Sequence, residues 1–203
     1  MPLTLHLPLR KILCRVAGVI FCLGAVVVIS LFIVVKCSRQ PFSPPDTSQW
    51  QTGDVFFSAG NAWQSTIVRA FGGESIDRST HCGFILINHG QLMLVHMSTE
   101  YNQITAETID QYAQVNDVSS IKAMRVTPPL DTVALRRYLQ YNLSIHRPFD
   151  HRFSHSDTTQ FYCTELIVQA LLAQQRTEPA HLLNLKFIYP ADIETLPSLH
   201  PLQ

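Results

Sequence analysis

The sequence predicts an α+β domain, in which helices pack on an antiparallel sheet, preceded by one transmembrane helix. Two apolar runs joined by the dipeptide His89–Gly90 predict a hairpin, and amphipathic segments at helical spacing follow it. An uncharged run, Val16 to Val35, precedes both. Strands and helices that share one small chain without an internal repeat are typical of the α+β class.

The N-terminal run predicts a membrane anchor. Residues 16–35 are enough to cross about 30 Å of hydrocarbon as a helix. A cleaved signal peptide would have a shorter apolar core and small residues at its exit, whereas Val34 and Lys36 stand there. We therefore expect an uncleaved signal anchor at 16–35, after a cytoplasmic tail of residues 1–15.

Flanking charge predicts the orientation of this anchor. Arg10, Lys11 and Arg15 precede the run, whereas Lys36 and Arg39 follow it. The excess of positive charge on the N-terminal side favours a cytoplasmic N-terminus. The globular domain is then expected on the outer side of the membrane.

The rest of the chain divides into a linker and one domain. Residues 38–49 contain three prolines among small polar residues, a composition typical of a semi-extended spacer. We expect a linker at 36–49 and a single domain at 50–203. Acidic and basic residues balance at 15 each without a basic cluster, so the sequence predicts no nucleic-acid partner.

Turn and capping residues place the elements of this domain. Asn61 and Asp131 are capping types ahead of apolar positions at helical spacing, and Pro128 with Pro129 would end a strand. In chain order we expect a strand at 53–57, a helix at 61–71, hairpin strands at 81–88 and 91–98, a helix over much of 104–114, a strand at 120–127, a helix at 132–143, an irregular loop at 146–159 and a helix carrying Cys163.

The hairpin brings two histidines together. A two-residue turn at His89 and Gly90 sets Gly83 opposite His96. Since side chains alternate between the faces of a strand, His81 and His96 become diagonal neighbours on one face. A base that a second polar group orients is what nucleophilic cysteine catalysis needs. A histidine at a strand end is more often just a satisfied polar residue, so this pair alone does not indicate catalysis.

Cys163 is the candidate nucleophile. Residues 156–159 are all capping types, so the helix should begin just before Cys163 and leave its thiol in the first turn. The helix dipole there lowers a thiol pKa. Leu166, Ile167 and Ala170 follow at helical spacing, which puts the thiol on the packing face. The alternative is that Cys163 is a small buried hydrophobe, the usual fate of a free cysteine.

Four segments carry a family resemblance. "TGDVFF", "STHCGFI", "RPFDHRF" and "FYCTELIV", in this order, resemble the YiiX/YebB-like group of circularly permuted, NlpC-type papain-like cysteine hydrolases, and "YPADIETLPSL" is similar to the closing segment of that group. The resemblance implies a papain-like fold in which the histidine strand precedes the cysteine helix. It implies Cys163 as nucleophile and His81 as general base. His96 would take the third, polar position, where many relatives have a carboxylate.

The resemblance also implies an activity: a cysteine hydrolase that forms an acyl-enzyme and cleaves an amide of a cell-wall peptide or an ester or thioester of a lipid, without a cofactor. With the anchor predicted from the apolar run, the enzyme would be attached to a membrane. The location would be the bacterial inner membrane, spanned once, with the domain in the periplasm. Three alternatives remain: a non-catalytic ligand-binding module on the same fold, a lipid acyltransferase, and a redox or metal sensor that uses Cys82 and Cys163.

Further residues have weaker assignments. Asp54 and Asp150 recur in the resemblance and, with Tyr162 beside the cysteine, are candidates for supporting the site. Glu165 is expected to be structural or a first-turn partner of the helix dipole, because it lies on another face of the helix than Cys163. Only Cys82 and Cys163 of the five cysteines fall in the domain, so no disulfide framework is predicted, although a bridge between these two stays open. The histidines of the 146–155 loop match no standard zinc spacing, and no metal site is predicted.

Overall fold

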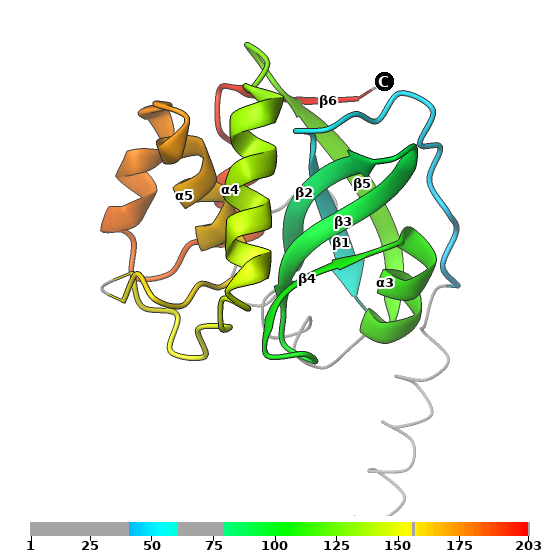
Figure 1. Ribbon diagram of the computed structural model, residues 1–203, viewed down its shortest axis with the longest axis horizontal. Coiled ribbons are helices and arrows are strands. Elements are labelled where there is room, and N and C mark those ends of the chain that lie inside the picture. Colours follow the sequence, from blue (N-terminus) through cyan, green and yellow to red (C-terminus); the bar gives the residue numbers. More distant parts are fainter. Residues whose placement is uncertain (1–40, 61–78, 156, 203) are drawn as a thin grey trace, which may run out of the picture. The chain divides into compact units, whose positions relative to one another are not determined.

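The computed structural model describes residues 41–60, 79–155 and 157–202, which belong to a compact unit, Pro41–Gln203 (Figure 1). The predicted tail and anchor at 1–35 and the predicted helix at 61–71 lie outside these described residues. Within the described ranges, no helix has both the length and the apolar character needed to span a membrane.

A six-stranded antiparallel sheet forms the centre of the unit. Its spatial order is β4-β3-β2-β1-β5-β6. The strands are β1 (Val55–Gly60), β2 (His81–Asn88), β3 (Gln91–Ser98), β4 (Gln103–Glu107), β5 (Val118–Val126) and β6 (Leu199–Pro201). The mixed α+β class is therefore confirmed, and β2 lies inside the sheet with a partner on each side.

The predicted hairpin is confirmed with its register. Asn88 pairs with Gln91 and Ile85 with Leu94, as a two-residue turn requires. His89 and Gly90 both have positive φ, 49° and 79°. Two positive φ values in succession give the mirror-image turn whose twist matches that of paired strands. This register fixes which side chains of β2 and β3 share a face.

Helices cover both faces of the sheet. They are α3 (Ile109–Asn116), α4 (Thr132–Ser144), α5 (Cys163–Ala173), the 3₁₀ turn η1 (Glu178–Asn184) and α6 (Pro190–Glu194). Figure 1 shows α4 and α5 on one side of the strands and α3 on the other. As predicted, Asp131 caps α4, because its carboxylate accepts from the N–H groups of Val133 and Ala134.

Strand alternation divides the apolar residues into two cores. Cys82, Phe84 and Val95 pack with α5 on one face of the sheet. Phe56 and Ile85 pack with Tyr112 of α3 on the other face. Consecutive residues of β2, such as Phe84 and Ile85, therefore belong to different cores on opposite faces of the sheet.

The helix predicted over 104–114 is wrong in its first half. Gln103–Glu107 forms β4, with Ile104 buried opposite Met97, and the helix begins only at Ile109. Thr108 separates the two elements, because its hydroxyl accepts from the N–H of Gln111 while the Gln111 side chain accepts from the N–H of Thr108. This reciprocal cap marks the start of the helix at Ile109, which the helical spacing of the apolar residues alone did not reveal.

Candidate active site

Cys163 is the first residue of α5, as the sequence predicted. The residue before it, Tyr162, occupies the capping position but makes no side-chain capping bond. The expected capping residues act elsewhere: Asp157, for example, accepts from the N–H of Thr159. Leu166 and Ile167 are fully buried against the sheet, whereas Cys163 is only partly buried. The helix therefore presents its first thiol and backbone N–H at its open N-terminal end.

His81, His96 and Glu107 form one hydrogen-bonded chain across three strands. His81 Nε2 lies 3.0 Å from His96 Nδ1, and His96 Nε2 lies 2.8 Å from Glu107 Oε2. His81 begins β2, His96 lies within β3, and Glu107 ends β4. The structure thus brings the two predicted histidines together and adds a carboxylate that the sequence reasoning did not single out.

The carboxylate sets the proton positions along this chain. An ionised Glu107 only accepts, so His96 must carry its proton on Nε2. A neutral His96 then accepts on Nδ1 from the Nε2–H of His81. The nitrogen left to His81 is Nδ1, with its lone pair available as a base. The network therefore orients the first histidine through the second.

Burial keeps the middle histidine neutral. His96 is fully buried, and this burial lowers its pKa; the hydrogen bond that His96 donates to Glu107 opposes the shift, and the charge of His81 adds to it. Glu107 is 4% exposed. A neutral, fixed imidazole between a carboxylate and a second imidazole can orient its neighbour without holding a charge itself.

Aromatic rings hold the two histidines in place. The ring of Tyr112 lies edge-on to His96 at 4.8 Å and stacks on His81 at 6.1 Å. Its hydroxyl hydrogen-bonds Ser58 Oγ at 2.6 Å. The ring of Phe56 packs edge-on to His96 at 6.2 Å. These contacts lie on the α3 side of the sheet and restrict the rotation of both imidazoles.

Gly83 makes this packing possible. A Cβ at this position would lie 2.4 Å from the carbonyl oxygen of Val95, 2.5 Å from the Phe56 ring and 2.8 Å from the Cβ of His96. All three distances are too short for any side chain. The sequence placed Gly83 opposite His96, and in the structure the Phe56 ring fills the space that a side chain at this position would need.

The thiol of Cys163 has a lowered pKa, which favours its ionised form. The hydrogen bond from the Cys82 thiol, and then the charge and hydrogen bond of His81, hold the pKa of Cys163 well below its ordinary value against the opposing effect of burial. The start of a helix favours thiolate in the same direction. Cys163 therefore interacts with two consecutive residues of β2, His81 and Cys82.

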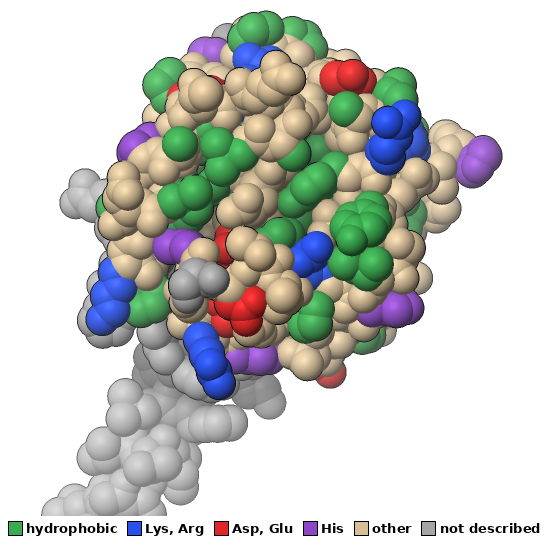
Figure 2. Space-filling model, turned by 60° about the vertical axis from the view of Figure 1, so that its left-hand side comes forward, with side chains coloured by type: hydrophobic (Ala, Val, Ile, Leu, Met, Phe, Trp, Pro, Cys, Tyr) green, Lys and Arg blue, Asp and Glu red, His purple; other side chains and the backbone are tan. Residues whose placement is uncertain are grey.

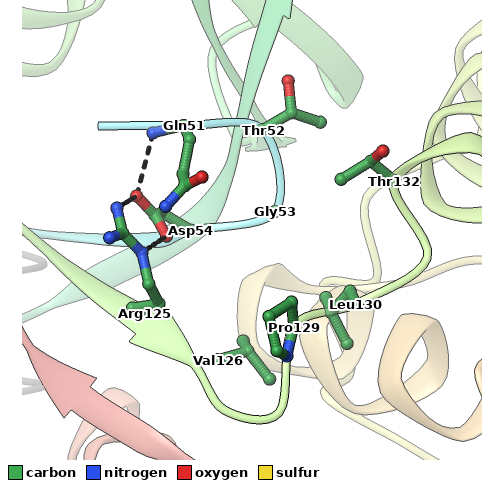
Figure 3. Close-up of a pocket in the computed structure, with 9 residues that line it drawn as sticks. All are labelled: Gln51, Thr52, Gly53, Asp54, Arg125, Val126, Pro129, Leu130 and Thr132. Atoms are coloured by element: carbon green, nitrogen blue, oxygen red, sulfur yellow. Dashed lines mark hydrogen bonds and ion pairs between the residues drawn. The ribbon is translucent and has the colours of Figure 1, made fainter. Parts of the chain in front are cut away.

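Asp54 lies at the other end of β1 from the residue that pairs with His81. Val55, which follows Asp54, pairs with Phe84, whereas Ser58 pairs with His81. The buried carboxylate of Asp54 forms an ion pair with Arg125 at 2.9 Å beside a hollow of about 70 Å³ (Figure 3). The structure does not bring Asp54 into the histidine chain.

Asp150 and Tyr162 support the segment that leads to Cys163. Asp150 is fully buried; its N–H donates to the carbonyl of Phe161, and its carboxylate accepts from the N–H groups of Arg152 and Ser154. The hydroxyl of Tyr162 accepts from the N–H of Ile188. Both side chains fix loop backbone near the start of α5, and neither belongs to the chain that ends at Glu107.

Glu165 is buried in the first turn of α5. Burial first, and then the nearby charge of Asp150, raise the pKa of Glu165 to about 8. Its carboxyl group is therefore largely protonated near neutral pH. Of the two roles expected from the sequence, a neutral carboxyl group agrees with the structural one and not with a charged partner of the helix dipole.

The comparisons with known proteins concern the fold. No protein-family model and no curated protein sequence matches the chain. Among solved structures, the crystal structure of the metalloprotein YiiX from Escherichia coli O157:H7, a DUF1105 protein, is similar, with a TM-score of 0.58. The match covers 76% of this chain and 97% of that chain, at 16% sequence identity. The chain therefore has a YiiX-like fold, and this part of the predicted resemblance is confirmed.

YiiX is described as a metalloprotein, which raises the question of metal ligands in this chain. Within the described residues, no group of three or more His, Cys, Asp or Glu side chains could hold a metal ion. His146, His151 and His155, the candidate loop histidines, each hydrogen-bond a different residue. The described part of this chain therefore does not fit a metal centre.

Proposed function

We propose that the protein is a cysteine hydrolase that cleaves an amide, ester or thioester bond through an acyl-enzyme on Cys163. One observation carries the proposal: His81, beside the thiol, is hydrogen-bonded to His96, which is hydrogen-bonded to Glu107. A nucleophile, a base and groups that orient the base are the parts that covalent acyl transfer requires.

The first half of the reaction forms the thioester. His81 Nδ1 takes the proton of the Cys163 thiol, and the thiolate attacks the substrate carbonyl carbon. The tetrahedral intermediate collapses as the imidazolium of His81 donates its proton to the leaving nitrogen, oxygen or sulfur. His96 and Glu107 hold the ring of His81 and stabilise its positive charge. The product of this half is an acyl group on Cys163 Sγ.

The second half regenerates the thiol. His81 Nδ1 takes a proton from water, the hydroxide adds to the thioester carbonyl, and the acid leaves as the Cys163 thiolate recovers the proton from His81. In both halves the carbonyl oxygen carries negative charge. The backbone N–H of Cys163, at the open start of α5, would donate a hydrogen bond to that oxygen.

The substrate class has two candidates. An amide in a cell-wall peptide agrees with the NlpC-type resemblance. An acyl ester or thioester of a lipid agrees with the surface near the start of α5, where Phe153 contacts the rings of Tyr162 and Phe187 and is 41% exposed. In Figure 2, hydrophobic side chains reach the surface on the face turned forward. This exposed apolar surface favours the lipid candidate.

The proposal also covers the cellular location of the domain and the fold family to which it is assigned. The domain would be a permuted papain-like hydrolase, held at the outer face of a bacterial inner membrane by the predicted anchor at 16–35 and the linker at 36–49. Protection of the intact domain from protease in spheroplasts with a closed membrane would contradict the periplasmic placement. Release of the protein by alkaline carbonate would contradict the anchor.

The test of the activity compares wild type with Cys163→Ala on three substrates: muropeptides, a phospholipid and an acyl thioester. The proposal expects release of an acid or amine from one of them by wild type and none by the variant. Cys163→Ser is the matched control for volume, since it keeps a hydroxyl in place of the thiol. Equal turnover by wild type and Cys163→Ala would contradict the proposal.

The second candidate function is a ligand-binding module on the same fold. The partial burial of Cys163 and the dense packing around the histidines are compatible with a site that binds without turnover. Such a module needs no thiolate. An ordinary alkylation midpoint for Cys163, near pH 8.5, would favour binding over catalysis.

A further inference from the structure

Cys82 is a buried thiol to which the proposed reaction assigns no role. It follows His81 in β2 and is fully buried. Because successive side chains of a strand point to opposite faces, Cys82 points away from the face on which His81 meets Tyr112. It belongs instead to the apolar core under α5, and Cys163 packs against this same core.

The packing of α5 on β2 sets Cys163 against the core that contains Cys82, and the pKa shifts of both sulfurs are consistent with a hydrogen bond between them. An S–H group is a weak donor, but it becomes useful next to an anion. Of the two sulfurs, Cys163 is the one at a helix start and beside His81, so it is the sulfur that carries negative charge. Cys82 is enclosed by apolar side chains such as Phe84, where a thiolate would be unfavourable.

We propose that Cys82 is a positioning residue whose S–H donates a hydrogen bond to the Cys163 thiolate. The nucleophile then interacts with two consecutive residues of β2, the imidazole of His81 and the thiol of Cys82. This inference rests on the proposed function only in taking Cys163 as the thiolate, and its measurement needs no substrate.

The pKa directions of the two sulfurs agree with this assignment. Burial, and then the hydrogen bond to Cys163, raise the pKa of Cys82 well above its ordinary value, while the same hydrogen bond lowers that of Cys163. Of the two thiols, Cys163 therefore ionises first, and Cys82 keeps its proton. A small buried hydrophobe at this position would provide packing but no proton.

The test measures the rate at which iodoacetamide alkylates Cys163 as a function of pH. The full-length protein is kept in reductant, and peptide mass spectrometry identifies the modified cysteine. Cys82→Ala and Cys82→Val remove the donor, whereas Cys82→Ser keeps a hydroxyl donor in nearly the same place. We expect the midpoint to move to higher pH in the Ala and Val variants. Below the wild-type midpoint their alkylation should be about tenfold slower, the change that one pH unit brings.

The rate at high pH separates the proposed role from a loss of structure. A thiolate with a higher pKa is intrinsically more nucleophilic, so the plateau rate should stay the same or rise in the Ala and Val variants. Val95→Ala removes volume from the same core without removing a donor, and we expect its midpoint to match that of wild type. Cys82→Ser should stay within about threefold of wild type below the midpoint, because it retains the hydrogen bond.

Two results would overturn the proposal. In the first, Cys82→Ala and Cys82→Val keep the low wild-type midpoint. In the second, Cys82→Ser shifts the midpoint as far as Cys82→Ala does, which would assign the effect to packing. A wild-type midpoint near pH 8.5 would instead contradict the proposed function itself. The two failures are therefore distinguishable.

Discussion

Glu107 Oε2 lies 2.8 Å from His96 Nε2, and this contact sets the proton positions on His96 and His81. Both groups are buried, at 4% and 0% exposure. A buried carboxylate accepts from His96 Nε2, so His96 accepts from His81, and His81 is left with a free lone pair on Nδ1. The activity proposed for Cys163 depends on this order.

Replacing Glu107 should lower the rate of the reaction. In Glu107→Gln the amide oxygen can still accept from His96, so the tautomer is retained but the negative charge is lost. We expect kcat/KM to fall about tenfold or more, with little change in the unfolding temperature. In Glu107→Ala the Nε2–H of His96 is left buried and unpaired, which should also lower the free energy of unfolding by about 1–3 kcal/mol. Equal activity in all three proteins would remove Glu107 from the site.

A methyl group at position 83 should displace the groups that pack around His96. In Gly83→Ala the added Cβ would overlap the Val95 carbonyl oxygen, the Phe56 ring and the Cβ of His96, and relief of this overlap should cost about 1–3 kcal/mol of unfolding free energy. Cys163 alkylation at neutral pH should slow as His81 and His96 separate. Chemical denaturation and the alkylation rate check the two effects.

Gly90→Ala is the matched control for this substitution. A Cβ at Gly90 would meet no atom within 4 Å, but its φ of 79° disfavours any other residue. We expect a loss of about 1 kcal/mol from the turn alone and an unchanged rate of Cys163 alkylation. If both glycine variants slowed alkylation equally, the packing at Gly83 would not be the cause.

Asp54 should contribute to stability and leave the thiol unaffected. Its partner Arg125 is 31% exposed on its side chain, so Asp54→Asn should lower the unfolding free energy by only about 1 kcal/mol. The ion pair lies at the opposite end of β1 from the pairing with His81. We therefore expect a wild-type pH midpoint for Cys163 alkylation in this variant. A shifted midpoint would return Asp54 to the group of residues that support the site.

Glu165 should make the fold less stable as pH rises. Its folded pKa is raised to about 8, so between an ordinary glutamate pKa and that value the folded state holds a proton that the unfolded state has lost. Stability then falls as pH rises through this window. Glu165→Gln keeps the neutral shape and should remove about 2 kcal/mol of this fall, allowing for solvent screening. Parallel stability curves for the two proteins from pH 5 to 8 would contradict the assignment.

The half of the site on the hairpin could be predicted from the sequence. The turn at His89 and Gly90 fixes a register, and strand alternation then pairs His81 with His96. The start of α5 at Cys163 was also predicted, although the capping residues that predicted it make their hydrogen bonds elsewhere. Each of these inferences uses positions close together in the sequence, where geometry leaves few choices.

Glu107 was missed because its strand was taken for a helix. The helical spacing of α3 extends back to Ile104, and only pairing with β3 shows that 103–107 is extended. As a strand, β4 sets Glu107 opposite Leu94 and therefore diagonal to His96 on the same face, the relation that already joined His81 to His96. The reciprocal cap of Thr108 and Gln111 was the available signal.

The role of Cys82 depends on tertiary structure. Nothing in the spacing of β2 and α5 shows which sulfur faces which, because the two lie on elements far apart in the sequence. The same holds for Tyr112, which reaches the histidines only because α3 folds back over the sheet. Long-range packing of this kind cannot be read from periodicity in either segment.

The most direct measurement is the mass of the full-length protein after mixing with a p-nitrophenyl acyl ester, followed by peptide mapping. The account predicts a single acyl adduct on Cys163 in wild type, formed with release of nitrophenol, and its formation at least about 100-fold more slowly in His81→Ala. Cys163→Ser serves to show that the adduct requires the thiol. An adduct on other cysteines but not on Cys163, or equal rates in wild type and His81→Ala, would contradict the account.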